Sequence, residues 1–549
     1  MARTPLLRSL RTLFTEYRAA RALGLPLHGL RETRAEQEHK VKSGAVPPVD
    51  RRRFLVGAGA AALAIGLPSS ARAKKAAPTV AIIGGGIAGL NCALQLADRN
   101  IDATVYEASG RLGGRMFSHT SGYWAQGQIS EWCGELIDTG HKTVRNLAKR
   151  FDLPLDDLLD AQLPGSEDTY RFFGGYYPKA QADVDFEGVF DALADDLDAA
   201  GYPTSFDDFT ATGQALDALS IHDWIETRVP GGHGSPLGML LDTAYVIEYG
   251  APTTDQSSLN LIYLLGYQPA QGGPAAFGES DERFHIRGGN QQLPEAMAAH
   301  LGVGDAVKLG HRLTRIKQTA SGRYQLNFDH NASSKTLTAD YVVLALPFAV
   351  LRDLDYGQAG FDALKDEAIQ ELGRGQNGKL QLQFSNRHWN QTGPWPGRSN
   401  GSTYSDTGYQ ASWEVSRAQP GSRGLMVLYS GGAATAGMST GTPFATASNP
   451  DVQADAAQGL SQIEPVFPGL SAKWNGKATQ SLPHLSSFFK ASYAYYRVGQ
   501  YTSFGGYEKA RQGGVLFGGE HTSTDFQGFM EGGATEGARC AKELDKLIK

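Results

Sequence analysis

The sequence predicts an α/β protein whose parallel sheet is assembled from segments that lie far apart in the chain. Three observations predict this class. Residues 80–83 (VAII) form a short β-branched run that leads directly into the glycine pattern GxGxxG. A second apolar run at 103–106 (ATVY) follows a stretch with helical spacing, and a third at 341–344 (YVVL) comes much later. Short apolar runs of this kind are typical of buried parallel strands.

The composition limits the size and class of the protein. With 549 residues, 41% hydrophobic and 20% charged, the chain is long enough for two or three domains with substantial cores. A net charge of −6 leaves no basic excess, so we expect no nucleic-acid partner. Cys92, Cys133 and Cys540 are widely spaced and odd in number. They predict neither a disulfide framework nor a zinc site, and we therefore expect no metal.

Residues 50–73 (DRRRFLVGAGAAALAIGLPSSARA) have the order of a secretory leader. Paired arginines precede a weakly apolar stretch, and Ala71-Arg72-Ala73 offers a small-residue cleavage site. This order is typical of a twin-arginine signal, so we expect residues 1–77 to be an arm and signal that direct export to the periplasm or the medium. The stretch is too short and too rich in alanine and glycine for a membrane span, and we expect no membrane insertion of the mature form. A buried hairpin or a retained anchor is the alternative.

The glycines after the first strand predict a nucleotide-binding turn. Gly84, Gly86 and Gly89 stand between residues 80–83 and a helix that opens with Ile87-Ala88. Glycine permits the tight turn and the close approach of a pyrophosphate, while the helix N-terminus supplies partial positive charge. The second strand ends in Glu107, at the distance of about 20 residues where a carboxylate can bind a ribose hydroxyl. A Rossmann-like dinucleotide site is therefore predicted.

The residues after Glu107 indicate which dinucleotide binds. The segment 107–115 reads EASGRLGGR, so that Glu107-Ala108 are followed by Arg111, Gly114 and Arg115. Two arginines near a pyrophosphate would neutralise its charge. The segment resembles the ExxxRxGGR signature of the flavin amine oxidase superfamily, which includes monoamine, polyamine and L-amino-acid oxidases. The resemblance implies that the cofactor is FAD.

Other segments extend this resemblance through most of residues 78–549. The stretches GGEHTS (518–523) and QGFMEGG (527–533) are typical of the family, as is GELID at 134–138. The resemblance implies cofactor contacts in these stretches and in a strand near residue 307: Gly134, Glu135, Leu136, Val307, Gly519, Glu520, Phe529 and Met530. Some relatives carry a flavin-linking cysteine where this chain has Ser492, so we expect FAD to be bound non-covalently.

The resemblance also implies how the chain is divided. We expect a discontinuous FAD-binding domain of the amine-oxidase type: residues 78–150, 280–345 and 485–549. Residues 151–279 show helical spacing and are expected to form a helical insert that bears on the substrate. Residues 346–484 are expected to form an α+β substrate-binding domain. Within it, the Gly-, Pro- and Ser-rich residues 393–408 predict a loop.

The family has no covalent catalytic residue, so the resemblance implies that the protein positions its substrate for hydride transfer to flavin N5 and excludes water. Lys379, in the run GKLQLQF, matches the family lysine that holds a water beside N5; a solvent-facing edge lysine is the alternative. Phe529 and Tyr493 match two aromatic walls around the substrate amine, with ordinary core packing as the alternative. Further substrate contacts are expected: Gly533, Trp224 and Tyr245.

The substrate class divides the hypotheses. Many L-amino-acid oxidases carry a carboxylate-binding arginine in a G-x-M-R pattern, where this chain reads Cys133-Gly134-Glu135-Leu136. The C-terminal stretches and the leader still resemble bacterial broad-specificity L-amino-acid oxidases. This implies L-amino acids and O2 as substrates, and a 2-oxo acid, ammonia and hydrogen peroxide as products. An oxidase of amines without a carboxylate is the alternative, and an inactive flavin-binding scaffold is a third hypothesis. The family also suggests a homodimer.

Overall fold

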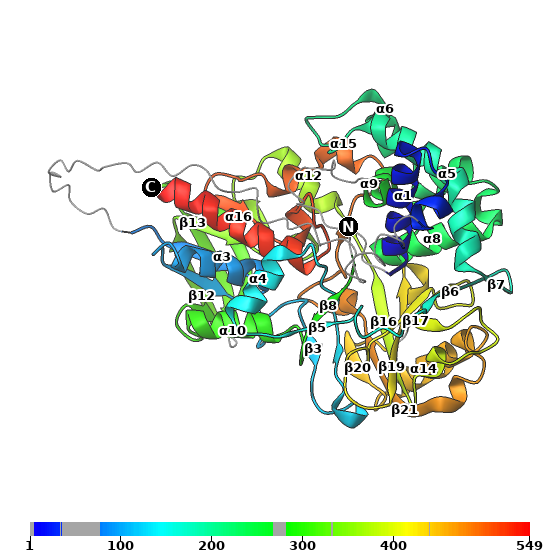
Figure 1. Cartoon of the computed structure of the whole chain (residues 1–549). Helices are drawn as coiled ribbons and strands as arrows, with labels where there is room; N and C mark the ends of the chain where they lie inside the picture. The colour runs from blue at the N-terminus through cyan, green and yellow to red at the C-terminus, as the bar shows by residue number, and fades with distance from the viewer. Residues whose placement is uncertain (1–4, 33–34, 36–76, 267–280, 331–332, 439) are drawn as a thin grey trace, which may run out of the picture. The chain divides into compact units, whose positions relative to one another are not determined.

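A five-stranded sheet carries the predicted nucleotide-binding turn in the computed structural model (Figure 1). Its order is β23-β13-β1-β2-β9, and all neighbouring strands run parallel. The strands are β1 (Val80–Ile83), β2 (Ala103–Tyr106), β9 (Val307–Lys308), β13 (Tyr341–Leu344) and β23 (Val515–Phe517). They come from the three separate ranges that the sequence assigned to the FAD-binding domain. The predicted α/β class is thus confirmed.

Two helices from opposite ends of this domain pack closely against each other. Figure 1 shows α16 (Met530–Ile548) lying alongside α3 (Ile87–Ala97). A Cβ atom added to Gly537 would lie 2.1 Å from the carbonyl oxygen of Ala88, so only glycine fits there. Asn91 Nδ2 also donates a 2.7 Å hydrogen bond to the carbonyl of Ala534. The absence of a side chain at Gly537 therefore sets how near the two helices come.

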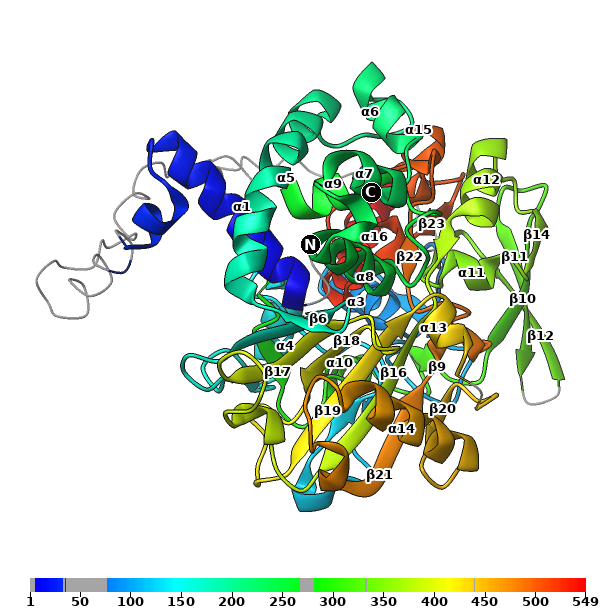
Figure 2. The same ribbon diagram turned by 90° about the vertical axis from the view of Figure 1, so that its right-hand side faces the viewer.

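A second sheet covers the face of the domain away from these helices. Its order is β12-β11-β10-β14, and Figure 2 shows its strands together at the right of the view. The strands are β10 (Arg312–Gln318), β11 (Tyr324–His330), β12 (Ser333–Ala339) and β14 (Asp355–Gln358). Leu326 and Phe328 of β11 are fully buried in one core with Ala81, Ile83 and Val342 of the parallel sheet. The two sheets therefore share a hydrophobic core.

The third large sheet has eight strands and belongs mainly to the predicted substrate-binding domain. Its order is β20-β21-β16-β19-β18-β17-β6-β7. The strands are β6 (Glu167–Phe172), β7 (Gly175–Tyr177), β16 (Asn377–Phe384), β17 (Ser399–Ser405), β18 (Ala411–Glu414), β19 (Gly424–Gly431), β20 (Phe444–Thr446) and β21 (Trp474–Ser481). Strands β6 and β7 lie within 151–279, a range expected to be helical, and they extend this sheet.

Strand β17 corrects the loop predicted over residues 393–408. Its seven residues, SNGSTYS, are polar or glycine, yet all of them are buried. Their polar groups find partners on neighbouring elements: Asn400 Nδ2 donates to Asp168 at 2.9 Å, and the Thr403 hydroxyl lies 2.7 Å from that of Ser412. Because these cross-strand hydrogen bonds satisfy the polar side chains, a serine-rich segment can form an interior strand.

Most of residues 179–266 form helices, as the spacing predicted. The helices are α5 (Lys179–Ala200), α6 (Ala211–Asp217), α7 (Ile221–Arg228), α8 (Pro236–Tyr249) and α9 (Ser258–Gly266). Their ends follow helix-capping chemistry: Ser235 Oγ accepts the N–H of Gly238 at the start of α8, and Gly250 ends it in the left-handed conformation. This insert packs on the eight-stranded sheet through the contact between Gly431 and Val246.

The structure describes residues 5–32, 35, 77–266, 281–330, 333–438 and 440–549. Residues 79–549 belong to one compact unit. The N-terminal arm contains helix α1 (Pro5–Ala22). The leader predicted at 50–73 lies outside the described residues and stays a prediction. Within the described ranges, no helix combines the length and the apolar character that crossing a membrane requires.

Replacing Gly537 with alanine tests the contact between α3 and α16. In an open helix this change would be stabilising, but here the new methyl group meets the backbone of Ala88. We expect the free energy of unfolding to fall by about 1–3 kcal/mol, measured by urea denaturation. Gly357→Ala is the matched control, because nothing lies within 4 Å of its added Cβ. Equal stability of both variants and the wild type would contradict the close contact.

Candidate active site

A cavity of about 1040 Å³ joins the nucleotide-binding turn to one face of the eight-stranded sheet. The turn after β1 lines one end through Gly84 and Gly86, and Lys379 of β16 lines the other. The first residues of α16, Met530 and Gly533, lie on the wall between them. The fold therefore brings the turn after β1, strand β16 and the start of α16, which are far apart in the sequence, to a single site.

Two helix N-termini open into this cavity without a side chain that caps them. Helix α3 begins after Gly86 and α16 after Phe529, and neither residue provides a capping hydrogen bond. Unsatisfied N–H groups and the helix dipole make such ends binding sites for anions and electron-rich groups. The side of Gly86 that a Cβ would occupy is open, since the nearest atom beyond its chain neighbours, the carbonyl oxygen of Gly113, would lie 3.9 Å from that Cβ. This arrangement fits a dinucleotide phosphate.

Glu107 is held rigidly at the end of β2, beside the same turn. Its carboxylate accepts hydrogen bonds from the N–H of Gly85 at 2.7 Å and from the N–H and hydroxyl of Ser109 at 2.8 and 2.7 Å. The side chain is nearly buried and lines the cavity. Ala108, Arg111 and Gly114 line it as well. The predicted acidic residue therefore reaches the position from which a ribose hydroxyl could be bound.

An ion pair ties the GGR turn to the C-terminal motif. Arg115 Nη1 lies 2.9 Å from Glu520 Oε1 and donates to the carbonyl of Ser492 at 2.8 Å. Glu520 Oε2 in turn accepts the N–H of Gly528 at 2.7 Å. These contacts bring the motifs at 107–115 and 518–533, read separately from the sequence, to one wall of the cavity.

Lys379 lies inside the protein and is paired with Glu135. Its strand, β16, is bordered on one side by β19 and on the other by β21, and the side chain is 9% exposed. Lys379 Nζ is 2.6 Å from Glu135 Oε2 and donates to the carbonyl of Cys133 at 2.8 Å. Glu135 Oε1 also accepts the indole N–H of Trp413 at 3.0 Å. The alternative of a solvent-facing edge lysine is therefore excluded.

Aromatic side chains surround this charged pair. Lys379 and Tyr429 face each other across β16 and β19, so both project from the same face of the sheet. The Tyr429 hydroxyl is 2.9 Å from that of Tyr493, which also donates to the carbonyl of Ile247 at 3.1 Å. Phe529 lines the cavity too, with its ring 5.2 Å from that of His141. Tyr493 and Phe529 thus lie in the cavity, as predicted.

The cavity holds two residues whose chemistry bears on how a flavin would be attached. Ser492, at the position of the flavin-linking cysteine in some relatives, donates its hydroxyl to Asn377 Oδ1 at 2.6 Å. Cys133 lines the cavity, but burial raises the pKa of its thiol to about 11. The thiol is therefore protonated at neutral pH and is a poor nucleophile. Both observations agree with non-covalent FAD.

Four of the predicted site residues are not among those that line the cavity. Trp224 is fully buried among the insert helices, where its indole N–H donates to Asp196 at 2.8 Å, so its prediction as a substrate contact was wrong. Val307 is buried in β9 against β2. Gly89 packs on the carbonyl of Gly84 and so shapes the turn without facing the cavity. Tyr245 is likewise a core residue that donates to the carbonyl of Leu261.

Most other predicted residues line the cavity: Gly84, Gly86, Ile87, Ala88, Gly134, Glu135, Leu136, Gly519, Glu520 and Met530 among them. Sequence reasoning missed Trp413, Tyr429 and His521. Trp413 and Tyr429 could have been found only by pairing β18 and β19 with β16. His521 lies within the GGEHTS motif, and its two ring nitrogens are buried without a hydrogen-bond partner among the described residues.

Comparison with known protein families assigns the cavity. A family model described as flavin containing amine oxidoreductase matches residues 87–545. The chain belongs to this family. FAD is accordingly its cofactor, and its activity is flavin-dependent amine oxidoreduction. The uncapped helix ends, the open side of Gly86 and the unpartnered ring of His521 fit that group.

Individual relatives of this amine oxidoreductase differ in their substrates. An L-amino acid dehydrogenase of Synechocystis sp. is 26% identical over 336 residues, which are 57% of this chain and 64% of that enzyme. A pseudooxynicotine dehydrogenase of Pseudomonas sp. is 23% identical over 91% of this chain and 96% of its own. Among solved structures, a cyclohexylamine oxidase from Brevibacterium oxydans has a TM-score of 0.71 at 19% identity and covers 86% of this chain and 100% of its own. That last likeness shows the fold alone.

Replacing Lys379 with methionine tests its pairing with Glu135. The change leaves a carboxylate that is 8% exposed without its counter-charge. Breaking such a buried pair costs about 3–5 kcal/mol, and we expect the free energy of unfolding to fall by that amount. The double variant Lys379→Met/Glu135→Gln should recover part of the loss in the same urea titration. A single variant as stable as the wild type would show that Glu135 does not depend on Lys379.

The buried ring of His521 makes stability depend on pH. Burial lowers the pKa of His521 from 6.5 to about 4, so the folded protein keeps the ring neutral where the unfolded chain protonates it. Its neutral form therefore favours folding fully above pH 6.5, and this contribution is lost as the pH falls from 6.5 towards 4. We expect the free energy of unfolding of His521→Leu to fall less than that of the wild type between pH 6.5 and pH 4, by a difference of roughly 3 kcal/mol at most. Urea denaturation at each pH measures this. His300→Ala changes an exposed histidine and should leave the pH dependence of the unfolding free energy as in the wild type. The wild-type pH dependence in His521→Leu would show that His521 does not cause it.

Proposed function

We propose that this chain oxidises L-amino acids at the carbon that bears the amino group. The imino acid formed would hydrolyse in water to a 2-oxo acid and ammonia, and O2 would receive the electrons to give hydrogen peroxide. The observation that carries this proposal is the continuity of the cavity between the nucleotide-binding turn and the aromatic end that contains Lys379. Relatives named as an L-amino acid dehydrogenase and, from Crotalus adamanteus, an L-amino-acid oxidase support this substrate class.

The cofactor and the chain would divide the work. FAD supplies the two-electron acceptor, and Gly86, Glu107 and Arg115 are the residues placed to hold it. Tyr429, Tyr493 and the other rings at the aromatic end would exclude water and fix the orientation of the substrate. Because Tyr429 and Tyr493 are joined by their hydroxyl groups, this wall is pre-organised before the substrate binds.

The pair of Lys379 and Glu135 suits a zwitterion. It places one charge of each sign at the aromatic end, 2.6 Å apart and almost out of contact with solvent. An L-amino acid carries both charges at neutral pH, so its carboxylate would be attracted to Lys379 and its ammonium group to Glu135. Oxidation requires the neutral amine, so the ammonium group must lose a proton before the hydride is transferred.

An oxidase of amines without a carboxylate is the second candidate, and the positions of the arginines favour it. Arg115 is paired with Glu520, and Arg111 donates to the carbonyls of Leu112 and Gly114. Arg312, in β10, lines the cavity near the nucleotide end. Of these three described arginines that line the cavity, Arg111 and Arg115 are thus already engaged by backbone carbonyls or a carboxylate. Relatives named as a pseudooxynicotine dehydrogenase and a polyamine oxidase agree with this candidate.

Anaerobic mixing with candidate substrates separates the two. The purified flavin-loaded protein is mixed with L-Phe, L-Gln, L-Lys, tyramine or spermidine, and the flavin absorbance is followed. We expect bleaching by at least one L-amino acid and none by its D-enantiomer, with peroxide formed when O2 is admitted. Bleaching by tyramine or spermidine alone would overturn the first candidate and establish the second. A flavin that no donor reduces would support the inactive scaffold.

A further inference from the structure

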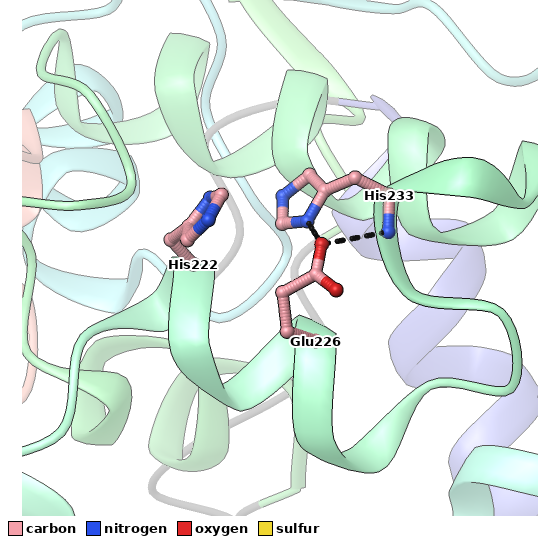
Figure 3. A group of neighbouring side chains, drawn as sticks. All are labelled: His222, Glu226 and His233. Atoms are coloured by element: carbon pink, nitrogen blue, oxygen red, sulfur yellow. Dashed lines mark hydrogen bonds and ion pairs between the residues drawn. The ribbon is translucent and has the colours of Figure 1, made fainter.

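A cluster of side chains in the helical insert, apart from the FAD cavity, has the composition of a metal site (Figure 3). His222 and Glu226 lie on α7, and His233 lies on the short 3-10 helix η3 (Gly232–Gly234). Each offers one ligand atom, and these atoms all lie within 4.8 Å of one another. Figure 3 shows the two rings and the carboxylate turned towards one another. We propose that these three residues bind a divalent transition-metal ion such as Zn²⁺.

The local sequence explains why the three side chains converge. His222 and Glu226 are four residues apart on α7 and therefore project from the same side of the helix. After α7 ends, Gly231 and Gly232 adopt left-handed backbone angles (φ of 81° and 50°) and turn the chain back. The N–H of His233 then donates to Glu226 Oε1 at 3.2 Å, which holds η3 against the helix.

The spacing is close to what a metal ion requires. With bonds of about 2.1 Å, a tetrahedral Zn²⁺ holds its ligand atoms about 3.4 Å apart. Ligand atoms up to 4.8 Å apart must therefore move together by about 1.4 Å at most. The Glu226 side chain is 48% exposed, so it can make this adjustment. Two imidazoles and one carboxylate form a donor set that suits Zn²⁺, Ni²⁺ or Cu²⁺.

An outer residue already orients one of the rings. His233 Nδ1 lies 2.5 Å from Glu226 Oε1, while Nε2, on the far side of the ring, is 3.3 Å from Asp242 Oδ1. Asp242 in turn accepts a hydrogen bond from the Thr253 hydroxyl. A metal-binding histidine commonly has its other nitrogen held by a carboxylate in this way. The arrangement directs Nδ1 of His233 towards Glu226 and the shared space.

The position of His222 favours a metal site over a simple ion pair between His233 and Glu226. Its ring stacks on that of His233, with centroids 4.2 Å apart and planes 25° from parallel. Among the described residues its ring nitrogens receive no hydrogen bond, so the Glu226–His233 pair alone gives His222 no role. The expectation of no metal rested on the spacing of the cysteines alone. The approach of His233 to His222 and Glu226 depends on the turn at Gly231, which that spacing does not reveal.

Metal binding at this place would brace the wall of the cavity. Asp242 lies on α8, and the carbonyl of Ile247, further along the same helix, accepts hydrogen bonds from Tyr493 and from Asn377. An ion that ties α7 to η3 would thus stabilise the helix that supports Tyr493. The site is a structural one by this assignment, and its existence does not depend on which amine the enzyme oxidises.

Zinc binding to the untagged, flavin-loaded protein tests the proposal. The protein is treated with a chelator and dialysed against ZnCl2, and bound zinc is measured by atomic emission. We expect one Zn²⁺ per chain in the wild type and at least tenfold weaker binding in His222→Ala and in His233→Ala. Zinc should also raise the Tm of the wild type but not of these variants. His300→Ala is the matched control, since it removes an exposed histidine outside the cluster, and it should bind zinc normally.

The outcome in His222→Ala decides the assignment, because that variant keeps the Glu226–His233 ion pair. Loss of zinc with flavin absorbance and metal-free Tm unchanged supports the site. If His222→Ala fails to fold, His222→Gln is used in its place. No stoichiometric zinc in the wild type, or equal zinc binding in the wild type and both histidine variants, would overturn the proposal.

Discussion

The close approach of α3 and α16 is the constraint on which the site depends. Gly533 leaves room for the side chain of Ile87 and Gly537 for the backbone of Ala88, so the two helices come together with their N-termini at the same cavity. One helix follows the first strand of the domain and the other ends the chain. Their contact therefore closes the discontinuous domain and at the same time places two uncapped helix N-termini at the cavity, where they could bind the phosphate and electron-rich groups of FAD.

The nucleotide half of the site could be predicted from the sequence because its chemistry is local. The turn at 84–89, the carboxylate at Glu107 and the arginine at Arg115 all act through backbone geometry or charge within short motifs. The pairing of Arg115 with Glu520 was not visible in the sequence, but the motifs that contain them were. When the residues of a site belong to one short motif, the motif itself predicts that they lie together at the cavity.

The substrate half was harder to predict because it is made across strands. Trp413 and Tyr429 reach Lys379 only through the register of β18, β19 and β16, and nothing near them in sequence marks them. The prediction for Trp224 failed for a different reason. Its ring is buried in the helical core, where Asp196 accepts the indole N–H, so it forms no wall of the cavity. The sequence predicts a loop where the buried polar strand β17 forms, because a partner such as Asp168, which accepts from Asn400, is distant in the chain.

The proposed function requires that Lys379 and Glu135 face the substrate beside the flavin. A crystal structure of the flavin-loaded protein with a bound, unreactive substrate analogue tests this most directly. We expect FAD to lie along the cavity, with Gly86 and Glu107 at its nucleotide end and Lys379 beside its ring system, and the analogue to lie between that ring and Tyr493. FAD bound elsewhere, or an analogue that contacts neither Lys379 nor Glu135, would contradict it.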